Sequence, residues 1–374
     1  MQTKICYLCL LALLFSCKKK PDAEGYLPAF PLGPFVRSTV VNPVIKPDTA
    51  TRFFDPILQD SVAWESNDTF NPAATVLNDE IVVLYRAEDR SGQGIGQRTS
   101  RLGYASSTDG LHFNRLSTPV FYPGNDTQKE LEYPGGCEDP RVSQTNDGLY
   151  VMFYTQWNRK VPRLAVATST DLQHWTKYGP AFAKAFDGRF FDMATKSASI
   201  VTCLENGKQV IAKLDGKYWM YWGEKAVYAA TSDNLTDWYP VLNDNGELKV
   251  LYQPRKGYFD SELTECGPPA ILSAEGIILL YNGKNAAGET GDPNYTPNTY
   301  CAGQALFSAE NPAQFLRALD KPFFVPEESF EKSGQYPAGT VFIEGLVYFQ
   351  KQWFLYYGCA DSRVAVAVFN PKKK

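Results

Sequence analysis

Residues 148–154 read Gly-Leu-Tyr-Val-Met-Phe-Tyr, a turn glycine followed by a run of apolar and aromatic residues that ends in tyrosine. Such a run is typical of a β-strand. The pattern occurs four more times, each time with Tyr or Trp at or next to its end. The other copies are Glu80–Arg86 (EIVVLYR), Gly216–Trp222 (GKYWMYW), Gly276–Tyr281 (GIILLY) and Lys351–Tyr357 (KQWFLYY). The sequence therefore predicts five related β units.

A second pattern follows the first three of these strands, in which a strand of small residues leads to a Ser/Thr-Asp turn and a closing aromatic residue. Its clear copies are Leu102–Phe113 (LGYASSTDGLHF), Leu164–Trp175 (LAVATSTDLQHW) and Val227–Trp238 (VYAATSDNLTDW), with weaker ones at Ala302–Phe315 and Val364–Phe369. The period of roughly 70 residues exceeds that of common propeller repeats, but it suits a four-stranded blade with long loops.

These repeats predict an all-β fold, a five-bladed β-propeller with its active site at the mouth of the central channel. A pair of β-sandwiches is the alternative, because short strands with Gly and Asp turns fit both folds. His112 and His174 occupy matching positions before the closing aromatic residue. We therefore interpret both as structural residues of the blades rather than as catalytic groups.

Composition excludes several classes of function. The 374 residues carry a net charge of −4, and Lys/Arg runs occur only at Lys18–Lys20 and in the C-terminal lysines, so there is no basic face for nucleic acid. The cysteines after Cys17 are irregularly spaced and predict neither a disulfide framework nor a zinc site. We expect no metal and no cofactor.

The N-terminus has the pattern of an export signal. Lys4 precedes an apolar run, Ile5–Phe15, that is too short to span a membrane as a helix. The following Ser16-Cys17 resembles the end of a bacterial lipobox, in which Cys17 receives lipid and becomes the mature N-terminus. An ordinary secretory signal cleaved nearby is the alternative.

The expected organisation is a lipoprotein signal over residues 1–17, a flexible tether over 18–34 and a catalytic domain over 35–374. Lipidation predicts attachment to the bacterial outer membrane, on its periplasmic or surface face. We favour the periplasmic face, because the lysines after Cys17 do not resemble an acidic surface-export signal.

Carboxylates outside the Ser/Thr-Asp turns mark the candidate active site. Glu138 and Asp139 lie beside Pro140 and Arg141, Glu224 directly follows the third tyrosine-containing strand, and Glu265 lies in the acidic loop 259–269. Two carboxylates are the minimum for cleaving a glycosidic bond, one as acid and one to activate a nucleophile. The alternative is that each binds backbone amides or an arginine.

These residues lie in a set of short motifs that occur in a fixed order. They are Phe70-Asn71-Pro72, Leu84–Asp89 (LYRAED), Glu138–Arg141 (EDPR), Glu265–Pro269 (ECGPP), Leu280–Gly283 (LYNG) and Tyr357–Asp361 (YGCAD). Over nearly all of Phe70–Phe369 the chain resembles glycoside hydrolase family 130, the β-mannoside phosphorylases and β-1,2-mannosidases. The resemblance also implies a five-bladed propeller.

The resemblance implies roles for individual residues. Asp139 matches the general acid, whose proton is thought to travel through a mannose hydroxyl in the phosphorylases. The residues assigned to substrate binding are Asn71, Arg86 and Asp361, which match the −1 mannose site, together with Glu138, Arg141 and Tyr281. The alternative for the Arg and Asp residues is a structural pair that ties blades together.

The chain departs from the phosphorylase pattern around the third blade. Phosphorylases carry an Arg-Asn or Arg-Asp pair before its strand and an Arg-Pro at its end, whereas this chain has KSASI at 196–200 and YWGE at 221–224. A phosphate dianion needs fixed cationic donors, so the missing arginines argue against phosphate as nucleophile. Glu224 and Glu265 resemble the glutamate pair with which hydrolytic members hold and deprotonate water.

The sequence thus predicts an inverting exo-β-mannosidase acting on β-1,2-linked mannosides, with Asp139, Glu224 and Glu265 as its catalytic residues. A β-mannoside phosphorylase and a sugar-binding lipoprotein without turnover are the alternatives. We expect the loop Asn285–Tyr300 to control access to the site. The predicted partners are a β-mannoside oligosaccharide and, through Cys17, the membrane.

Overall fold

The computed structural model describes residues 26–371, and this part of the chain is all-β. Its helices are one short α-helix, α1 (Lys129–Glu132), and two 3-10 turns, η1 (Gly288–Thr290) and η2 (Ser329–Glu331). No helix within residues 26–371 has the length and apolar character needed to cross a membrane. The predicted signal peptide, its Cys17 and residues 18–25 of the predicted tether lie outside the described residues.

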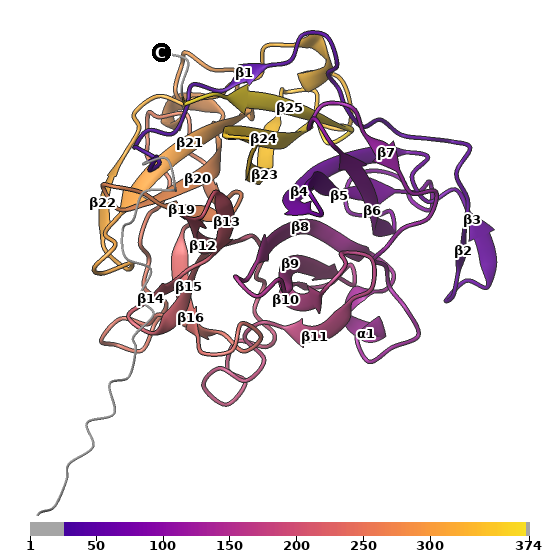
Figure 1. The fold of residues 1–374 in the computed structure, drawn as a ribbon, viewed down its shortest axis with the longest axis horizontal. Helices are drawn as coiled ribbons and strands as arrows, with labels where there is room; N and C mark the ends of the chain where they lie inside the picture. Colours follow the sequence, from indigo (N-terminus) through magenta and orange to yellow (C-terminus); the bar gives the residue numbers. More distant parts are fainter. Residues whose placement is uncertain (1–25, 372–374) are drawn as a thin grey trace, which may run out of the picture.

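Five antiparallel units follow one another in chain order and surround the middle of the molecule (Figure 1). The first contains β4 (Asp68–Leu77), β5 (Glu80–Glu88), β6 (Ser100–Ser107) and β7 (Asn114–Arg115). The second contains β8 (Gly136–Gln144), β9 (Tyr150–Trp157), β10 (Pro162–Ser169) and β11 (Thr176–Pro180). The third contains β12 (Ala198–Glu205), β13 (Lys208–Ile211), β14 (Lys213–Leu214), β15 (Lys217–Trp222), β16 (Tyr228–Ser232) and β17 (Tyr239–Pro240).

The fourth unit contains β18 (Leu263–Cys266), β19 (Ala270–Leu272), β20 (Ile277–Lys284), β21 (Tyr300–Phe307) and β22 (Phe315–Ala318). The fifth combines both ends of the described chain, β23 (Val341–Phe349), β24 (Gln352–Cys359), β25 (Arg363–Phe369) and β1 (Val36–Arg37). A hairpin of β2 (Phe53–Asp55) and β3 (Asp60–Val62) lies to one side (Figure 1). The five repeated runs are β5, β9, β15, β20 and β24, as the sequence predicts.

Buried apolar side chains form five clusters, each between two successive units. The cluster between the last and the first unit joins Ile81 and Val83 of β5 to Phe354 of β24 and Val366 of β25. Strand residues that alternate between two such clusters are buried on both faces, which explains the nearly continuous apolar runs in the sequence.

The Ser/Thr-Asp turns have the repeated structural task that the sequence indicates. The Asp109 carboxylate accepts the backbone N–H of His112 at 2.9 Å, and the imidazole lies 2.8 Å from the other oxygen. Asp171 and His174 repeat both contacts. The two imidazole side chains are 73% and 89% exposed, and each contacts the aspartate of its own turn.

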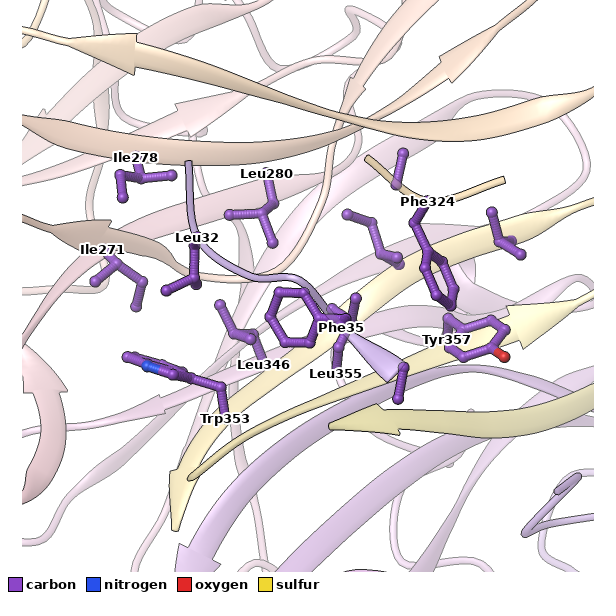
Figure 2. Close-up of a cluster of buried hydrophobic side chains, with 14 of the residues drawn as sticks. Leu32, Phe35, Ile271, Ile278, Leu280, Phe324, Leu346, Trp353, Leu355 and Tyr357 are labelled. Carbon is purple, nitrogen blue, oxygen red and sulfur yellow. The ribbon is translucent and has the colours of Figure 1, made fainter. Parts of the chain in front are cut away.

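The predicted flexible tether is wrong for residues 26–34, which pack against the fold. Leu32 is 2% exposed, and its backbone N–H and carbonyl both bind the Gln304 side chain, at 2.8 and 2.7 Å. Figure 2 shows Leu32 among side chains of the fourth and fifth units, with Phe35 beside it. The Pro- and Gly-rich composition suggested a solvated linker, but the apolar residues within it are buried in a core cluster.

Candidate active site

A cavity of about 330 Å³ lies near the starts of β4, β8, β12 and β23. Its lining combines carboxylates, two cations and a rim of aromatic side chains. The lining residues are Phe70, Asn71, Arg86, Ile95, Gly96, Glu138, Asp139, Trp157, Pro162, Lys196, Glu224, Glu265, Tyr300, Tyr336, Phe342 and Asp361. A larger hollow of about 760 Å³ lies at the opposite ends of β4, β8 and β23 and is lined by turns with only one carboxylate, that of Asp79. The groups able to perform acid–base chemistry are therefore in the smaller cavity.

The backbone is irregular at several residues in or next to the cavity. The β4–β5 pairing shifts register at Asn71 and the β8–β9 pairing at Asp139, with φ of 46° and 50°. Ser197 and Asp361 also have positive φ, 59° and 50°. Bulges re-aim side chains, and left-handed conformations of residues other than glycine are concentrated at functional sites because they cost free energy.

Arg86, at the end of β5, binds three carboxylates on one side of the cavity. Its guanidinium donates to Asp139 at 2.9 Å, to Glu138 at 2.8 Å and to Glu88 at 2.7 Å. Burial alone would lower the pKa of Arg86, but the three carboxylates outweigh burial and hold this pKa well above its usual value. Arg86 is therefore a permanent cation with its hydrogen-bonding capacity largely used by protein groups.

The carboxyl groups near Arg86 differ in their proton affinity. Burial favours the protonated form of Asp139, but Arg86, Lys196 and the 2.9 Å hydrogen bond from Asn71 outweigh burial, so its pKa lies well below normal. Burial raises the pKa of Glu138 to about 7, and repulsion from Asp139 adds to this shift. Burial likewise raises the pKa of Asp361 to about 7. The unliganded cavity thus holds an ionised Asp139 next to carboxyls that keep a proton near neutrality.

Lys196, just before β12, lies among the three predicted catalytic carboxylates. Its Nζ is 3.8 Å from Asp139, 3.7 Å from Glu224 and 3.9 Å from Glu265. The sum of the Asp139 and Glu224 distances sets an upper bound on the separation of these two carboxylate oxygens, and this bound lies within the range of about 6.5–9.5 Å for an inverting acid–base pair. One ammonium group therefore brings the candidate acid and both candidate bases together.

Aromatic side chains form the rim of the cavity. The Tyr300 and Tyr336 rings lie 5.3 Å apart, and the Lys284 ammonium lies 5.7 Å from the Tyr300 ring while it binds Glu262 at 2.8 Å. The loop expected to control access ends at Tyr300, on the cavity wall. Aromatic faces and a flanking ion pair suit a sugar ring with polar edges.

The model of a family described as β-1,4-mannooligosaccharide phosphorylases, glycoside hydrolase family 130, matches residues 40–373. The chain belongs to glycoside hydrolase family 130. Among curated relatives of this family 130 enzyme is a 1,2-β-oligomannan phosphorylase of Thermoanaerobacter sp. (strain X514), 32% identical, which covers 83% of this chain and 92% of its own length.

Solved structures similar to this family 130 enzyme include a glycosyl hydrolase from Bacteroides ovatus. It is 65% identical, with a TM-score of 0.91, and the match covers 95% of this chain and 98% of that one. Another comes from work on glycoside hydrolases, within the family 130 mannoside phosphorylases, that target β-1,2 mannosidic linkages in Candida mannan. It is 63% identical with a TM-score of 0.91 and the same coverage.

Two residues predicted to bind substrate do not line the cavity of this family 130 enzyme. Arg141 lies beneath it and donates to the carbonyl oxygens of Gly267 and Cys266, each at 3.0 Å, so it joins the second unit to the fourth. Tyr281 is fully buried, and its hydroxyl donates to Asp260 at 2.7 Å. Their motifs flank the site, but the alternation of side chains along a strand points these two elsewhere. The other predicted site residues, Asn71, Arg86, Glu138, Asp139, Glu224, Glu265 and Asp361, line the cavity.

Sequence reasoning missed two charged groups. Lys196 was interpreted only as the absence of a phosphate-binding arginine, although it lies among the predicted catalytic carboxylates. Glu344, at a bulge of β23, is fully buried 3.0 Å from Arg141 Nη2, without the geometry of a hydrogen bond. Burial raises the pKa of Glu344 well above normal. The only signal for Glu344 was a charged residue inside an apolar run, Val341–Phe349.

Proposed function

We propose that this protein is an inverting exo-β-mannosidase that hydrolyses β-1,2-linked mannosides with water as the nucleophile. The observation that carries the proposal is the placement of Asp139, Glu224 and Glu265 within 4 Å of one ammonium group, which gathers a candidate acid and two candidate bases in one cavity. The glycosidase relatives at more than 60% identity support the same chemistry.

In the proposed mechanism Asn71, Arg86 and Asp361 bind the hydroxyls of the terminal mannose. Water held by Glu224 and Glu265 attacks C1, gives its proton to one of these glutamates, and α-mannose forms as the C1–O bond breaks. The leaving oxygen takes a proton from Asp139, directly or through a sugar hydroxyl. Glu138 and Asp361, with pKa values of about 7, are the nearby groups able to supply that proton to Asp139.

The cations of the cavity also favour water over phosphate. Of the described residues that line the cavity, Arg86 and Lys196 are the cationic ones, and each faces three carboxylates. A phosphate dianion entering this site would meet Glu224 and Glu265 without an uncommitted guanidinium fork. Electrostatic repulsion therefore opposes phosphorolysis.

Phosphorolysis of β-mannosides is the second candidate function. It is favoured by the curated relative at 32% identity, whose name is 1,2-β-oligomannan phosphorylase. In that case Lys196 would contact phosphate and the product would be mannose 1-phosphate. Both candidates take a β-mannoside, so the identity of the nucleophile separates them.

Proton NMR of the purified protein with β-1,2-mannobiose tests the proposal, first in phosphate-free buffer and then with phosphate added. Release of α-mannose at the same rate in both buffers is the expected result. Turnover only with phosphate, with mannose 1-phosphate as product, would replace hydrolysis by phosphorolysis. Saturable binding without any product would leave the sugar-binding alternative.

We infer further that the five units are the blades of a β-propeller and that the cavity is the mouth of its central channel. The five clusters between successive units, one of which joins the last to the first, support this architecture. Small-angle scattering from the purified protein measures the overall shape. A compact disc fits a propeller, whereas two separate maxima in the distance distribution would fit paired sandwiches.

We also propose that Cys17 carries lipid and attaches the enzyme to the bacterial outer membrane. The support is the Leu14–Cys17 pattern after a short apolar run. Labelled palmitate should enter the wild-type chain and not Cys17→Ala, which should be recovered in the soluble fraction. Protease added to intact cells distinguishes the two faces, because a periplasmic enzyme is protected until the outer membrane is opened.

A further inference from the structure

Lys196 is fixed among groups from three different units. Asp139 comes from β8, Glu224 follows β15 and Glu265 lies on β18, and each has an oxygen 3.7–3.9 Å from the Lys196 ammonium. The Lys196 side chain is 22% exposed, so it is neither freely solvated nor part of the apolar core. At these distances the ammonium attracts all three carboxylates without being committed to a short hydrogen bond with one.

The backbone around Lys196 is tied to both glutamates. The N–H of Gly223 donates to the carbonyl oxygens of Lys196 and Ser197, at 3.2 and 3.0 Å, which fixes the turn that presents Glu224. The Ser197 hydroxyl donates to Glu265 Oε1, and Ser197 has a φ of 59°. Gly223 has a φ of 122°, and a Cβ there would overlap the Ala226 carbonyl oxygen. The backbone segments that carry Lys196, Glu224 and Glu265 are therefore linked directly to one another.

The charge around Lys196 is dominated by carboxylates. Besides its three partners, Lys196 interacts electrostatically with Glu138, Asp361 and Glu344. The other cations that interact with these carboxylates are Arg86 and Arg141. Burial raises the pKa of Glu265 and repulsion from Glu224 adds to this, while the Lys196 charge lowers it. Without the ammonium, burial and the neighbouring Glu224 would raise the pKa of Glu265 further.

We propose that Lys196 is a positioning residue that holds Glu224 and Glu265 side by side and favours the ionised form of Glu265, so that the pair can accept a proton from water. The inference rests on the proposed hydrolytic function and adds to it the residue that positions the catalytic base. Its three carboxylates in turn neutralise Lys196, which makes the ammonium a poor site for an anionic nucleophile.

The test compares Lys196→Met, Lys196→Arg and wild type through the pH profile of kcat/KM on β-1,2-mannobiose in phosphate-free buffer. Lys196→Met should lower kcat by about 100-fold or more, the scale of general acid–base catalysis. It should also move the acidic limb of the profile upward by about one pH unit or more, because a neighbouring charge changes a pKa by about 1 to 3. Lys196→Arg should keep the acidic limb near its wild-type position.

Lys177→Met is the matched control. Lys177 is 12% exposed and binds Glu132 and Asp126 away from the cavity, so its loss should lower the melting temperature and leave the acidic limb unchanged. A Lys196→Met enzyme that loses stability as Lys177→Met does, but keeps wild-type kcat and an unshifted acidic limb, would overturn the inference while leaving hydrolysis intact. A wild-type enzyme that releases no mannose without phosphate would instead remove the proposed function, and the role of Lys196 with it.

Discussion

At the scale of single residues, the cavity contains more carboxylates than cations, and this imbalance sets its chemistry. Arg86 and Lys196 face six carboxyl groups, those of Glu88, Glu138, Asp139, Glu224, Glu265 and Asp361. Burial raises the pKa of Glu138 and Asp361, whereas the two cations outweigh burial at Asp139 and lower its pKa, so the pKa values within the cavity diverge. Divergent pKa values within one cavity are what proton transfer at neutral pH requires.

Replacing Asp139 with Asn should separate acid catalysis from the other contributions. We expect Asp139→Asn to lower kcat/KM on β-1,2-mannobiose by about 100- to 10,000-fold, since a positioned general acid contributes a factor of that size. On 2,4-dinitrophenyl β-mannoside, whose leaving group departs without a proton, the loss should be much smaller. Initial rates on both substrates measure the difference.

Asp192→Asn controls for the change from acid to amide, because Asp192 is 83% exposed and pairs only with Arg163 among the contacts of the described residues. It should leave both rates unchanged. Equal losses on the two substrates with Asp139→Asn would show that Asp139 binds or orients mannose rather than protonating the leaving oxygen.

The raised pKa of Glu138 predicts a pH-dependent stability. Folded Glu138 keeps its proton up to about pH 7, whereas the unfolded residue loses it near 4.5. Its contribution is therefore fully present below about pH 4.5 and is lost as the pH rises through about 7, and each pH unit between these two values removes about 1.4 kcal/mol. Glu138→Gln cannot ionise, so its melting temperature should improve relative to wild type between pH 5 and pH 8.

Thermal unfolding at pH 5, 6, 7 and 8 measures this difference. Glu262→Gln is a suitable control, because Glu262 is a partly exposed carboxylate on the rim, paired with Lys284. Parallel melting curves for wild type and Glu138→Gln across this pH range would mean that Glu138 is ionised throughout.

At the scale of elements, two of the five repeated strands place their tyrosine opposite a glycine of the neighbouring strand. Tyr85 on β5 pairs with Gly103 on β6, and Tyr281 on β20 pairs with Gly303 on β21. In both pairs a Cβ on the glycine would overlap the tyrosine ring. The two hydroxyls bind buried carboxylates, Tyr85 to Glu65 and Tyr281 to Asp260. In these two units the repeated tyrosine therefore has a structural role, because its hydroxyl binds a buried carboxylate.

Gly103→Ala should therefore destabilise the protein by about 1–3 kcal/mol, the usual cost of overpacking a core. The reason is steric overlap with the Tyr85 ring, since Gly103 does not have a positive φ. Chemical denaturation gives the free energy of unfolding. Gly124→Ala is the control, because its Cβ would meet only the flexible end of Asp126. Equal stability of the two variants would show that the tyrosine ring can move aside.

The elements were predictable where the pattern is local. The sequence predicts the five repeated strands, β5, β9, β15, β20 and β24, from their β propensity. It predicts the Ser/Thr-Asp turns from the hydrogen bonding of Ser, Thr and Asp side chains to nearby backbone. Contacts between units were not predictable in this way. Arg141 and Tyr281 occupy family motifs but point away from the cavity, and Lys196 acquires its role only from carboxylates on three units.

At the scale of the whole molecule, the segment from residue 26 to β1 joins the fourth unit to the fifth. Leu32 binds Gln304 of β21 and packs among residues of β20, β23 and β24, and β1 then pairs with β25 (Figure 2). Arg37 binds Glu331 at 2.7 Å, and Glu331 accepts the hydroxyl of Tyr357 on β24 at 2.8 Å.

This arrangement predicts that the N-terminal segment contributes to global stability. Leu32→Ala should lower the free energy of unfolding by about 2–5 kcal/mol, because it empties a buried leucine site. Val40→Ala removes an apolar side chain that is 90% exposed just after β1, and it should have no effect. Denaturant titration of both variants gives the comparison. Equal stability of the two variants would show that residues 26–34 are dispensable for folding, whereas a loss confined to Leu32→Ala would show that this segment is part of the core that joins the last two units.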